Sequence, residues 1–190
     1  MIPLEKKIIL ASKSPRRSQL LKAAGFQFEV KALEVDESFS DDLKKEEVAE
    51  HLAIRKAEAA KSFLKGEDII LAADSIVLLN GIIYGKPKDR SDAQNILRAL
   101  SGQKHQVITG VCLLSKDKQV SFSGVSDVYM RSLSAAEIDY YIDHFQPYDK
   151  AGAYAIQEWI GLCKIERIEG TYSNIMGLPV ELVYRHLEAF

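Results

Sequence analysis

The stretch that decides the fold runs from Ile69 to Tyr84 and reads IILAADSIVLLNGIIY. Its first part, Ile69–Ala73, is an apolar run of the length typical of a buried strand, and a second apolar run follows at Ile76–Leu79. The pair Asn80-Gly81 then precedes Ile82–Tyr84, and both turn residues favour the positive φ angles of a two-residue hairpin. Because a hairpin joins antiparallel strands, the sheet cannot be wholly parallel.

Further strands and helices are predicted on both sides of this stretch. Short apolar runs predict strands at residues 7–11, 28–32, 105–114, 119–129 and 162–168. Helical periodicity predicts helices over 41–64 and 179–187. Capping residues predict three more helices. The first runs from Ser14-Pro15 to Gly25, the second from a Ser91/Gln94 capping box to Leu100, and the third from a Ser134/Glu137 capping box to near Phe145. These elements predict an α/β (α+β) fold with a mixed, twisted β-sheet and flanking helices.

The composition describes an ordinary globular chain. Its 190 residues fit one domain spanning 1–190, and 47% of them are hydrophobic. The net charge of −2 gives no overall basic field, which argues against a nucleic-acid partner. No apolar run is long enough for a membrane span or a signal peptide, and Cys112 and Cys163 are expected to be buried and reduced. We therefore expect a cytoplasmic protein.

The segment Ala11–Arg17 is the first of four candidate functional clusters. It follows a predicted strand and opens a helix, where free backbone N–H groups favour an anion. Two hydroxyls and the guanidiniums of Arg16 and Arg17 would complete a cradle for a polyphosphate. The alternative, an ordinary capped surface helix with exposed arginines, fits the spacing equally well.

The second cluster is Ala72-Ala73-Asp74-Ser75, at the end of a predicted buried strand. A carboxylate that interrupts an apolar run is costly to bury unless it is paired or binds a metal, although an Asp in a simple turn is the alternative. The third is Gly85-Lys86-Pro87, which is no P-loop because its glycine spacing from Gly81 is one residue short and proline replaces the Ser or Thr. Lys86 is still able to contact a phosphate as a point charge.

The fourth cluster is the segment Asp149–Gln157, which reads DKAGAYAIQ. Its small residues permit close backbone approach to a ligand, and the amide of Gln157 both donates and accepts hydrogen bonds. A tightly packed loop with a solvated glutamine is the alternative. The chain lacks the G-x-S-x-G motif of serine hydrolases, and its four scattered histidines predict no zinc site.

Taken together, these motifs resemble the Maf family. The matching segments are Ser12–Arg17, Ala73–Ser75, Gly85–Pro87, Leu100–Gly102, His105–Val107, Asp149–Tyr154 and Met176–Pro179. They occur in order through essentially the whole chain, so the likeness does not rest on one short motif. The resemblance implies a two-lobed fold around a central cleft, similar to that of inosine triphosphatase, and a nucleoside triphosphate pyrophosphatase activity.

The resemblance also implies roles for individual residues. Asp74 would be the catalytic carboxylate. Glu37 would assist it by binding a divalent cation, with Asp36 as a further ligand. The cation would be Mg²⁺ or Mn²⁺, which suit hard oxygen ligands. The residues that would bind the nucleotide are Ser12, Arg16, Arg17, Lys56, Ser75, Lys86 and Gln157.

The identity of residue 157 indicates which nucleotides such a site would select. The branch of the family that acts on 7-methyl-GTP tends to have glutamate at this position. With Gln157, this chain more closely resembles the dTTP/UTP branch. One amide can pair with the carbonyl acceptor and the N3–H donor of uracil or thymine, although it could also pair with adenine. Ser75 stands where the family usually has threonine, a change that keeps the hydroxyl and loses a methyl group.

Two classes of function are thus to be compared. The first is hydrolysis of dTTP and UTP to monophosphate and pyrophosphate, as a house-cleaning enzyme that removes non-standard or excess nucleotides. The second is a non-catalytic nucleotide-binding regulator of cell division, which would use the same arginines. In both, the partner is a small nucleotide with no nucleic acid or membrane, and a homodimer is compatible with the sequence.

Overall fold

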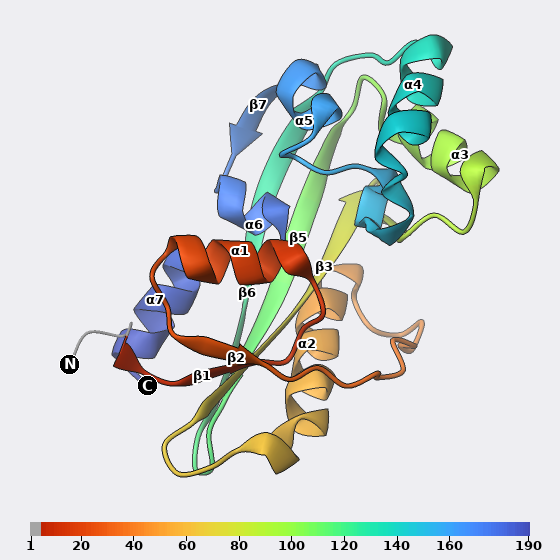
Figure 1. Cartoon of the computed structure of the whole chain (residues 1–190). Helices are drawn as coiled ribbons and strands as arrows, with labels where there is room; N and C mark the ends of the chain where they lie inside the picture. Colours follow the sequence, from red (N-terminus) through yellow and green to blue (C-terminus); the bar gives the residue numbers. More distant parts are fainter. Residues whose placement is uncertain (1–4) are drawn as a thin grey trace. The chain divides into compact units, whose positions relative to one another are not determined.

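The computed structural model describes residues 5–190, whose strands form a seven-stranded mixed sheet (Figure 1). The strand order is β2-β1-β3-β5-β6-β7, and β4 pairs with β3 off this path. The strands are β1 (Ile8–Leu10), β2 (Phe28–Val30), β3 (Ile69–Leu79), β4 (Ile82–Tyr84), β5 (Lys104–Leu114), β6 (Gln119–Met130) and β7 (Ile165–Glu169). Strand β1 is parallel to β2 and β3, whereas the β3–β4 and β6–β7 pairs are antiparallel. The expected mixed sheet is confirmed.

Helices flank the strands, as the sequence predicts. The α-helices are α1 (Pro15–Ala23), α2 (Val48–Ala59), α3 (Arg90–Leu100), α4 (Ala135–Phe145), α5 (Trp159–Lys164), α6 (Tyr172–Met176) and α7 (Val180–Glu188). Short 3₁₀ segments occur at η2 (Lys45–Glu47), η3 (Lys61–Phe63), η4 (Pro147–Asp149) and η5 (Ala151–Ala153).

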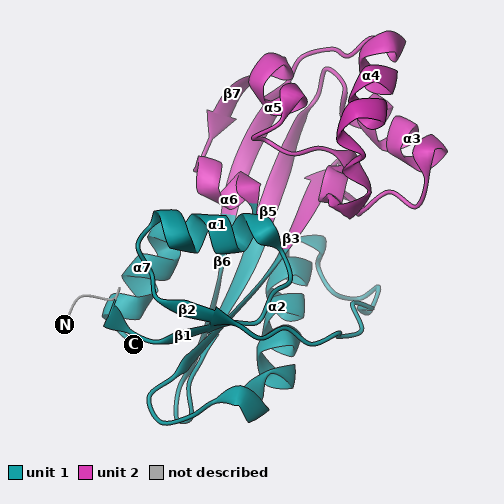
Figure 2. Cartoon of the chain, viewed as in Figure 1, with its two compact units in different colours: residues 1–74, 109–124, 177–190 teal, residues 75–108, 125–176 magenta. Residues whose placement is uncertain are grey.

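The chain divides into two compact units (Figure 2). Unit 1 comprises the described residues up to Asp74 together with Thr109–Gly124 and Gly177–Phe190, and unit 2 comprises Ser75–Ile108 and Val125–Met176. Strands β3, β5 and β6 therefore each contribute residues to both units.

In unit 1 strands β1 and β3 are covered on both faces. Alternate residues of β1 and β3 pack with α1 and α7 in one buried cluster, which includes Leu10, Leu71 and Leu187. The intervening residues, such as Ile9 and Ile70, pack on the other face with the small side chains of α2. This two-sided burial explains why β1 and the first half of β3 read as continuous apolar runs.

In unit 2 one cluster of buried side chains joins the strand ends to α3 and α4. It contains Val77 and Val128 from the strands, Leu97 from α3 and Tyr141 from α4, and Tyr154 from the loop that carries the fourth sequence cluster. That loop therefore packs into the core of this unit and is not a solvent-exposed loop.

Two predicted local structures are confirmed in detail. Asn80 and Gly81 form the hairpin turn with φ angles of 52° and 76°. Ser134 and Glu137 form a reciprocal capping box at the start of α4.

Other predicted boundaries were wrong. Strand β3 continues through Asp74, so this residue lies within a strand and not at its end. Helix α3 begins at Arg90 because the Asp89 carboxylate, not Ser91, caps it by accepting a bond from the Asp92 backbone N–H at 2.9 Å.

The predicted 41–64 helix is also shorter than expected. Only Val48–Ala59 is α-helical, between the 3₁₀ turns η2 and η3. The predicted strand at 162–168 starts at Ile165, since the preceding residues complete α5. Both cysteines are free thiols, but only Cys112 is buried, whereas Cys163 on α5 is exposed.

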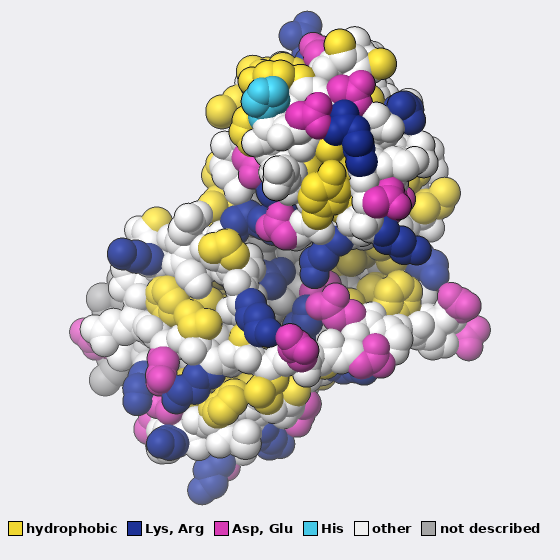
Figure 3. All heavy atoms as spheres, turned by 45° about the vertical axis from the view of Figure 1, so that its right-hand side comes forward, with side chains coloured by type: hydrophobic (Ala, Val, Ile, Leu, Met, Phe, Trp, Pro, Cys, Tyr) yellow, Lys and Arg dark blue, Asp and Glu magenta, His cyan; other side chains and the backbone are white. Residues whose placement is uncertain are grey.

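The surface charge is mixed. On the face shown in Figure 3, Lys and Arg side chains lie beside Asp and Glu side chains and form no large area of one sign. Among residues 5–190, no helix combines the length and apolarity needed to cross a bilayer.

Gly110→Ala is expected to destabilise the protein, because β5 approaches α2 too closely for a side chain. A Cβ at this position would lie 2.2 Å from the Glu50 backbone nitrogen and 2.3 Å from the Ala49 carbonyl carbon. Backbone atoms cannot rotate away, so we expect a loss of about 1–3 kcal/mol in the free energy of unfolding, measured with urea. Gly85→Ala is the matched control, since no atom lies within 4 Å of its added Cβ. Equal stability of the two variants would contradict the close packing.

Candidate active site

The turn after β1 places a hydroxyl and a guanidinium together. Pro15 stands at the first position of α1, where its fixed φ angle suits the helix. Ser14 occupies the N-cap with an extended backbone, but its hydroxyl makes no capping hydrogen bond within the described chain. Instead the Ser14 backbone N–H donates to Ser12 Oγ at 3.2 Å. The expectation of a Ser14 hydroxyl cap was wrong, and Ser12 organises this turn.

Arg17 is buried and connects this turn to a distant segment. Its Nη1 donates to Ser12 Oγ at 3.0 Å, and its Nε donates to the backbone carbonyl of Gly177 at 2.8 Å. Only 9% of the residue surface is exposed. The segment around Gly177, whose sequence matches the family motif, is thus held against the start of α1.

The electrostatics of Arg17 link this turn to the predicted catalytic carboxylates. Burial lowers the pKa of its guanidinium, while the negative charges of Asp74 and Glu37 raise it and the positive charge of Arg16 lowers it. These opposing effects require Asp74, Glu37 and Arg16 each to lie within electrostatic range of Arg17. In unit 1 the guanidinium of Arg17 and the carboxylates of Asp74 and Glu37 are therefore electrostatic neighbours.

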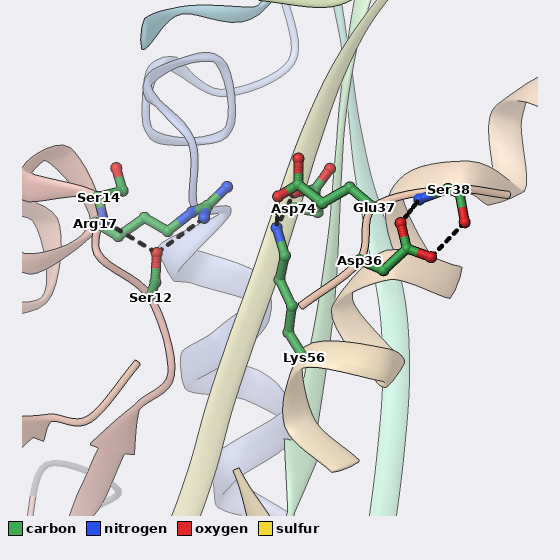
Figure 4. Close-up of polar contacts among 8 residues, drawn as sticks. All are labelled: Ser12, Ser14, Arg17, Asp36, Glu37, Ser38, Lys56 and Asp74. Atoms are coloured by element: carbon green, nitrogen blue, oxygen red, sulfur yellow. Dashed lines mark hydrogen bonds and ion pairs between the residues drawn. The ribbon is translucent and has the colours of Figure 1, made fainter. Parts of the chain in front are cut away.

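Lys56 connects the two carboxylates directly (Figure 4). Its ammonium group, carried by α2, lies 2.5 Å from Asp74 Oδ1 and 2.7 Å from Glu37 Oε1. The side chains of Lys56 and Asp74 are each only 15% exposed, whereas that of Glu37 is 48% exposed. A mid-strand carboxylate in β3 is thus compensated by a cation from the helix that covers it.

Asp36 lies beside Glu37 in sequence but has other partners. Its carboxylate accepts hydrogen bonds from the Ser38 backbone N–H at 3.0 Å and the Ser38 hydroxyl at 2.6 Å, and lies 3.5 Å from Arg55 Nη2. The hydrogen bonds from Ser38 lower the pKa of Asp36. In Figure 4 this carboxylate points toward Ser38 and away from Lys56. The structure therefore brings Glu37 and Asp74 together, without Asp36.

The carboxylate pair has the donor chemistry for a divalent cation with few protein ligands. Residues 5–190 contain no group of three or more His, Cys, Asp or Glu side chains arranged to hold a metal. Glu37 and Asp74 already share one positive charge, that of Lys56. Two carboxylates suit Mg²⁺, which usually keeps several waters and binds substrate phosphates.

Unit 2 carries the remaining predicted site residues. Ser75 follows Asp74 in β3, and Lys86 follows the β3–β4 hairpin. The backbone N–H of Gly152 donates to the carbonyl of Gly85 at 3.1 Å, which ties the loop of Gln157 to the segment of Lys86. Gln157 Oε1 is buried and has no hydrogen-bond partner among residues 5–190.

The sequence did not reveal the groups that hold this loop. Tyr141 on α4 and Glu158 interact with each other, and Lys150 binds Glu158. His105 Nε2 lies 2.8 Å from the Tyr154 hydroxyl. Burial lowers the pKa of His105 to about 4, so its ring is neutral at pH 7. Lys150 and Tyr154 belong to a recognised motif, but nothing in the sequence pairs them with distant residues.

A double-mutant cycle with Lys56→Met and Asp74→Asn is expected to show strong coupling. Lys56→Met removes the cation in contact with the mostly buried Asp74, and Asp74→Asn leaves Lys56 paired with Glu37, whereas the double change removes both charges of the pair. We expect a coupling of about 1–3 kcal/mol in the free energy of unfolding. Lys13→Met with Glu34→Gln is the matched control, because that pair is 3.0 Å apart but largely exposed. Its coupling should not be resolvable from zero. A Lys56/Asp74 coupling as small as the control would show that the ion pair does not hold this strand.

Comparisons with known proteins identify the family of this chain. The family model described as Maf-like protein matches residues 7–190. A protein of Bacteroides fragilis named dTTP/UTP pyrophosphatase is 49% identical over 183 residues, covering 96% of this chain and 95% of that protein. A Phocaeicola vulgatus protein of the same name is 49% identical over 187 residues, covering 97% of each chain.

The solved structure of the Staphylococcus aureus Ham1 protein shares the fold. It covers 97% of this chain and 99% of its own with a TM-score of 0.58 and 19% sequence identity. The motifs, the fold and the full-length sequence matches lead to one assignment: this chain belongs to the Maf family.

Proposed function

We propose that this Maf protein hydrolyses dTTP and UTP to the nucleoside monophosphate and pyrophosphate. The observation that carries the proposal is the cluster in unit 1, where Lys56 joins Asp74 to Glu37 and both carboxylates lie within electrostatic range of Arg17. The names of the relatives from Bacteroides fragilis and Phocaeicola vulgatus, which match over nearly their full lengths, support the substrate class.

Binding of the triphosphate falls to the hydroxyl and cationic groups. Ser12 Oγ accepts two hydrogen bonds, from Arg17 and from the Ser14 backbone, so its own proton is directed elsewhere and is suited to a phosphate oxygen. Arg16, Arg17, Lys56 and Lys86 supply positive charge for the triphosphate and for the departing pyrophosphate. Arg17 also fixes Ser12 through the bond already described.

Asp74 and Glu37 would hold the divalent cation, Mg²⁺ or Mn²⁺. When bound, the ion would neutralise charge on the triphosphate oxygens. We restrict the protein ligands to these two carboxylates, because Asp36 is engaged by Ser38 and Arg55. Lys56 would then exchange its contacts with the carboxylates for contacts with phosphate.

Asp74 is the proposed general base. Its carboxylate takes a proton from a water molecule whose oxygen forms a bond to the α-phosphorus. The bond from that phosphorus to the bridging oxygen breaks, and pyrophosphate leaves with the electron pair. Phosphoryl transfer of this kind requires mainly positioning and charge compensation, which the cluster provides.

Gln157 is the proposed reader of the pyrimidine base. Its amide can accept from the N3–H group of uracil or thymine and donate to the neighbouring carbonyl. Because Oε1 has no partner in residues 5–190, rotating the amide toward a base breaks no hydrogen bond at that oxygen. We propose that the hydroxyl of Ser75 also contacts the nucleotide.

Asp74→Asn is expected to lower kcat by about 10²–10⁴-fold, because asparagine cannot take the proton from water. Release of pyrophosphate from dTTP and UTP with Mg²⁺ or Mn²⁺ measures the effect, and circular dichroism confirms folding. Asp117→Asn, the same change at an exposed position, should retain wild-type activity. Near wild-type turnover by folded Asp74→Asn would remove Asp74 from the role of base.

Gln157→Glu is expected to lower kcat/KM for dTTP and UTP by about 10²-fold or more, since a carboxylate accepts but cannot donate to the base carbonyl. Steady-state kinetics with dTTP, UTP, CTP and GTP measure the preference. Gln119→Glu provides the matched control, because it adds the same charge at an exposed position. An unchanged order of substrates in Gln157→Glu would assign base selection to other residues.

The pyrophosphate assay also tests the alternative of a non-catalytic regulator. Such a protein would bind these nucleotides and release no pyrophosphate with any of them. A cytoplasmic location and a homodimer stay predictions, to be tested by fractionation and by light scattering.

A further inference from the structure

A single buried hydroxyl holds the chain on both sides of Gln157. Tyr141 lies on α4 with no exposed surface. Its hydroxyl accepts a hydrogen bond from the Ala155 backbone N–H at 3.1 Å and donates one to the carboxylate of Glu158. Ala155 and Glu158 flank Ile156 and Gln157 in the sequence, so the backbone that carries Gln157 is tied at both ends to one atom.

The carboxylate of Glu158 extends this connection to the start of the loop. Its Oε1 lies 3.4 Å from Lys150 Nζ, and that ammonium also lies 2.7 Å from Asp149 Oδ1. The Lys150 side chain is only 9% exposed. A buried lysine of this kind requires partner charges. Asp149 supplies one from the adjacent position, and Glu158 supplies a second from the other end of the loop. The ten residues from Asp149 to Glu158 are thus closed by side chains.

The protonation of Tyr141 keeps the connection intact. Burial raises the pKa of its hydroxyl most, and the hydrogen bond to Glu158 raises it further. The phenol therefore stays protonated through the neutral and mildly alkaline range, in which it remains a donor to Glu158.

The backbone of this loop needs such support. Gly152 and Ala153 have positive φ angles of 70° and 56°, which for alanine is an unfavourable conformation. A Cβ on Gly152 would lie 2.7 Å from Val77 Cγ2, so the loop approaches β3 as closely as its side chains allow. Strained backbone persists where its surroundings fix it, and such positions often belong to functional sites.

We infer that Tyr141, Glu158 and Lys150 form a positioning brace that orients Gln157 and thereby sets the preference for uracil and thymine over cytosine. This inference rests on the proposed function of Gln157 as the reader of the base. None of the three brace residues is assigned a contact with the nucleotide. Cytosine has an acceptor at N3 and an amino donor beside it, so rejecting it requires the amide to be held in one orientation.

The brace predicts a specific loss of selectivity. In Tyr141→Phe the hydroxyl that binds Ala155 and Glu158 is absent. In Glu158→Gln the charge that links the far end of the loop to Lys150 is absent, and of the two carboxylates only Asp149 still faces that lysine. We expect kcat/KM for UTP and dTTP to fall by about 10- to 100-fold, because displacements of about 1 Å in a positioned group have effects of this size. CTP should lose much less, so the UTP/CTP ratio of kcat/KM should fall by tenfold or more.

Tyr129→Phe is the matched control. Tyr129 also donates to a glutamate in unit 2, Glu169 at 3.1 Å, but on β6 and β7 and not at the loop of Gln157. Its substitution should leave the UTP/CTP ratio unchanged. Circular dichroism and thermal unfolding establish that each variant is folded, and Lys150→Met carries the same test if Tyr141→Phe does not fold.

A Gln157→Ala background separates positioning from general damage. If the brace acts through Gln157, the double variant Tyr141→Phe/Gln157→Ala should have the same UTP/CTP ratio of kcat/KM as Gln157→Ala alone. A ratio that stays at the wild-type value in folded Tyr141→Phe, or that falls further in the double variant, overturns the inference.

Binding of UMP and CMP by calorimetry distinguishes this inference from the proposed function. A wild-type protein that releases no pyrophosphate from any nucleotide refutes the proposed hydrolysis. The UMP/CMP ratio of dissociation constants then still reports on the brace, which is supported if Tyr141→Phe shifts that ratio toward one and overturned if it does not.

Discussion

The ammonium of Lys56 is the contact on which the candidate site of unit 1 depends. Strand β3 is covered on both faces, and a carboxylate in its interior would be unfavourable without compensation. Lys56 provides it from α2 and at the same time draws in Glu37 from a loop. The small side chains of α2, together with the bare backbone of Gly110, let the helix approach closely enough for the lysine to reach. Packing and charge therefore specify the same helix position.

This arrangement fits a reaction in which the protein contributes mainly charge. A lysine between two carboxylates keeps them near each other although they repel, and keeps the cluster close to neutral. An incoming triphosphate would bring negative charge and its cation positive charge. Lys56 and the two carboxylates could then exchange partners without leaving a charge unpaired. The local balance matters more here than the net charge of the chain, which is only −2.

Much of the fold followed from local patterns in the sequence. The Asn80-Gly81 turn and the Ser134/Glu137 capping box were predicted because each depends on residues next to one another. The cap of α3 was misassigned because Asp89 and Ser91 are both good caps and only the backbone path selects between them. Asp74 was placed at a strand end because the sequence does not show Lys56, 18 residues away, as its partner.

The site was predictable to the extent that it is carried by motifs. In unit 1 Lys56 contacts Asp74 and Glu37, and both carboxylates lie within electrostatic range of Arg17. Asp36 is instead held by the hydroxyl of Ser38, a contact two residues away. Tyr141 and Glu158 gave no signal, because a tyrosine on the apolar face of a helix looks like any other core residue. Its function depends on the hydroxyl at the far end of the ring, which only the three-dimensional contacts show.

The bond from Arg17 to Gly177 joins positions 160 residues apart. During synthesis, Arg17 leaves the ribosome long before its acceptor exists, and chains usually begin to fold from the amino terminus. Until Gly177 emerges, the arginine has to stay hydrated, and the turn that holds Ser12 lacks its anchor. A nascent chain therefore completes the contacts of the turn between β1 and α1 only after the segment of Gly177 has emerged.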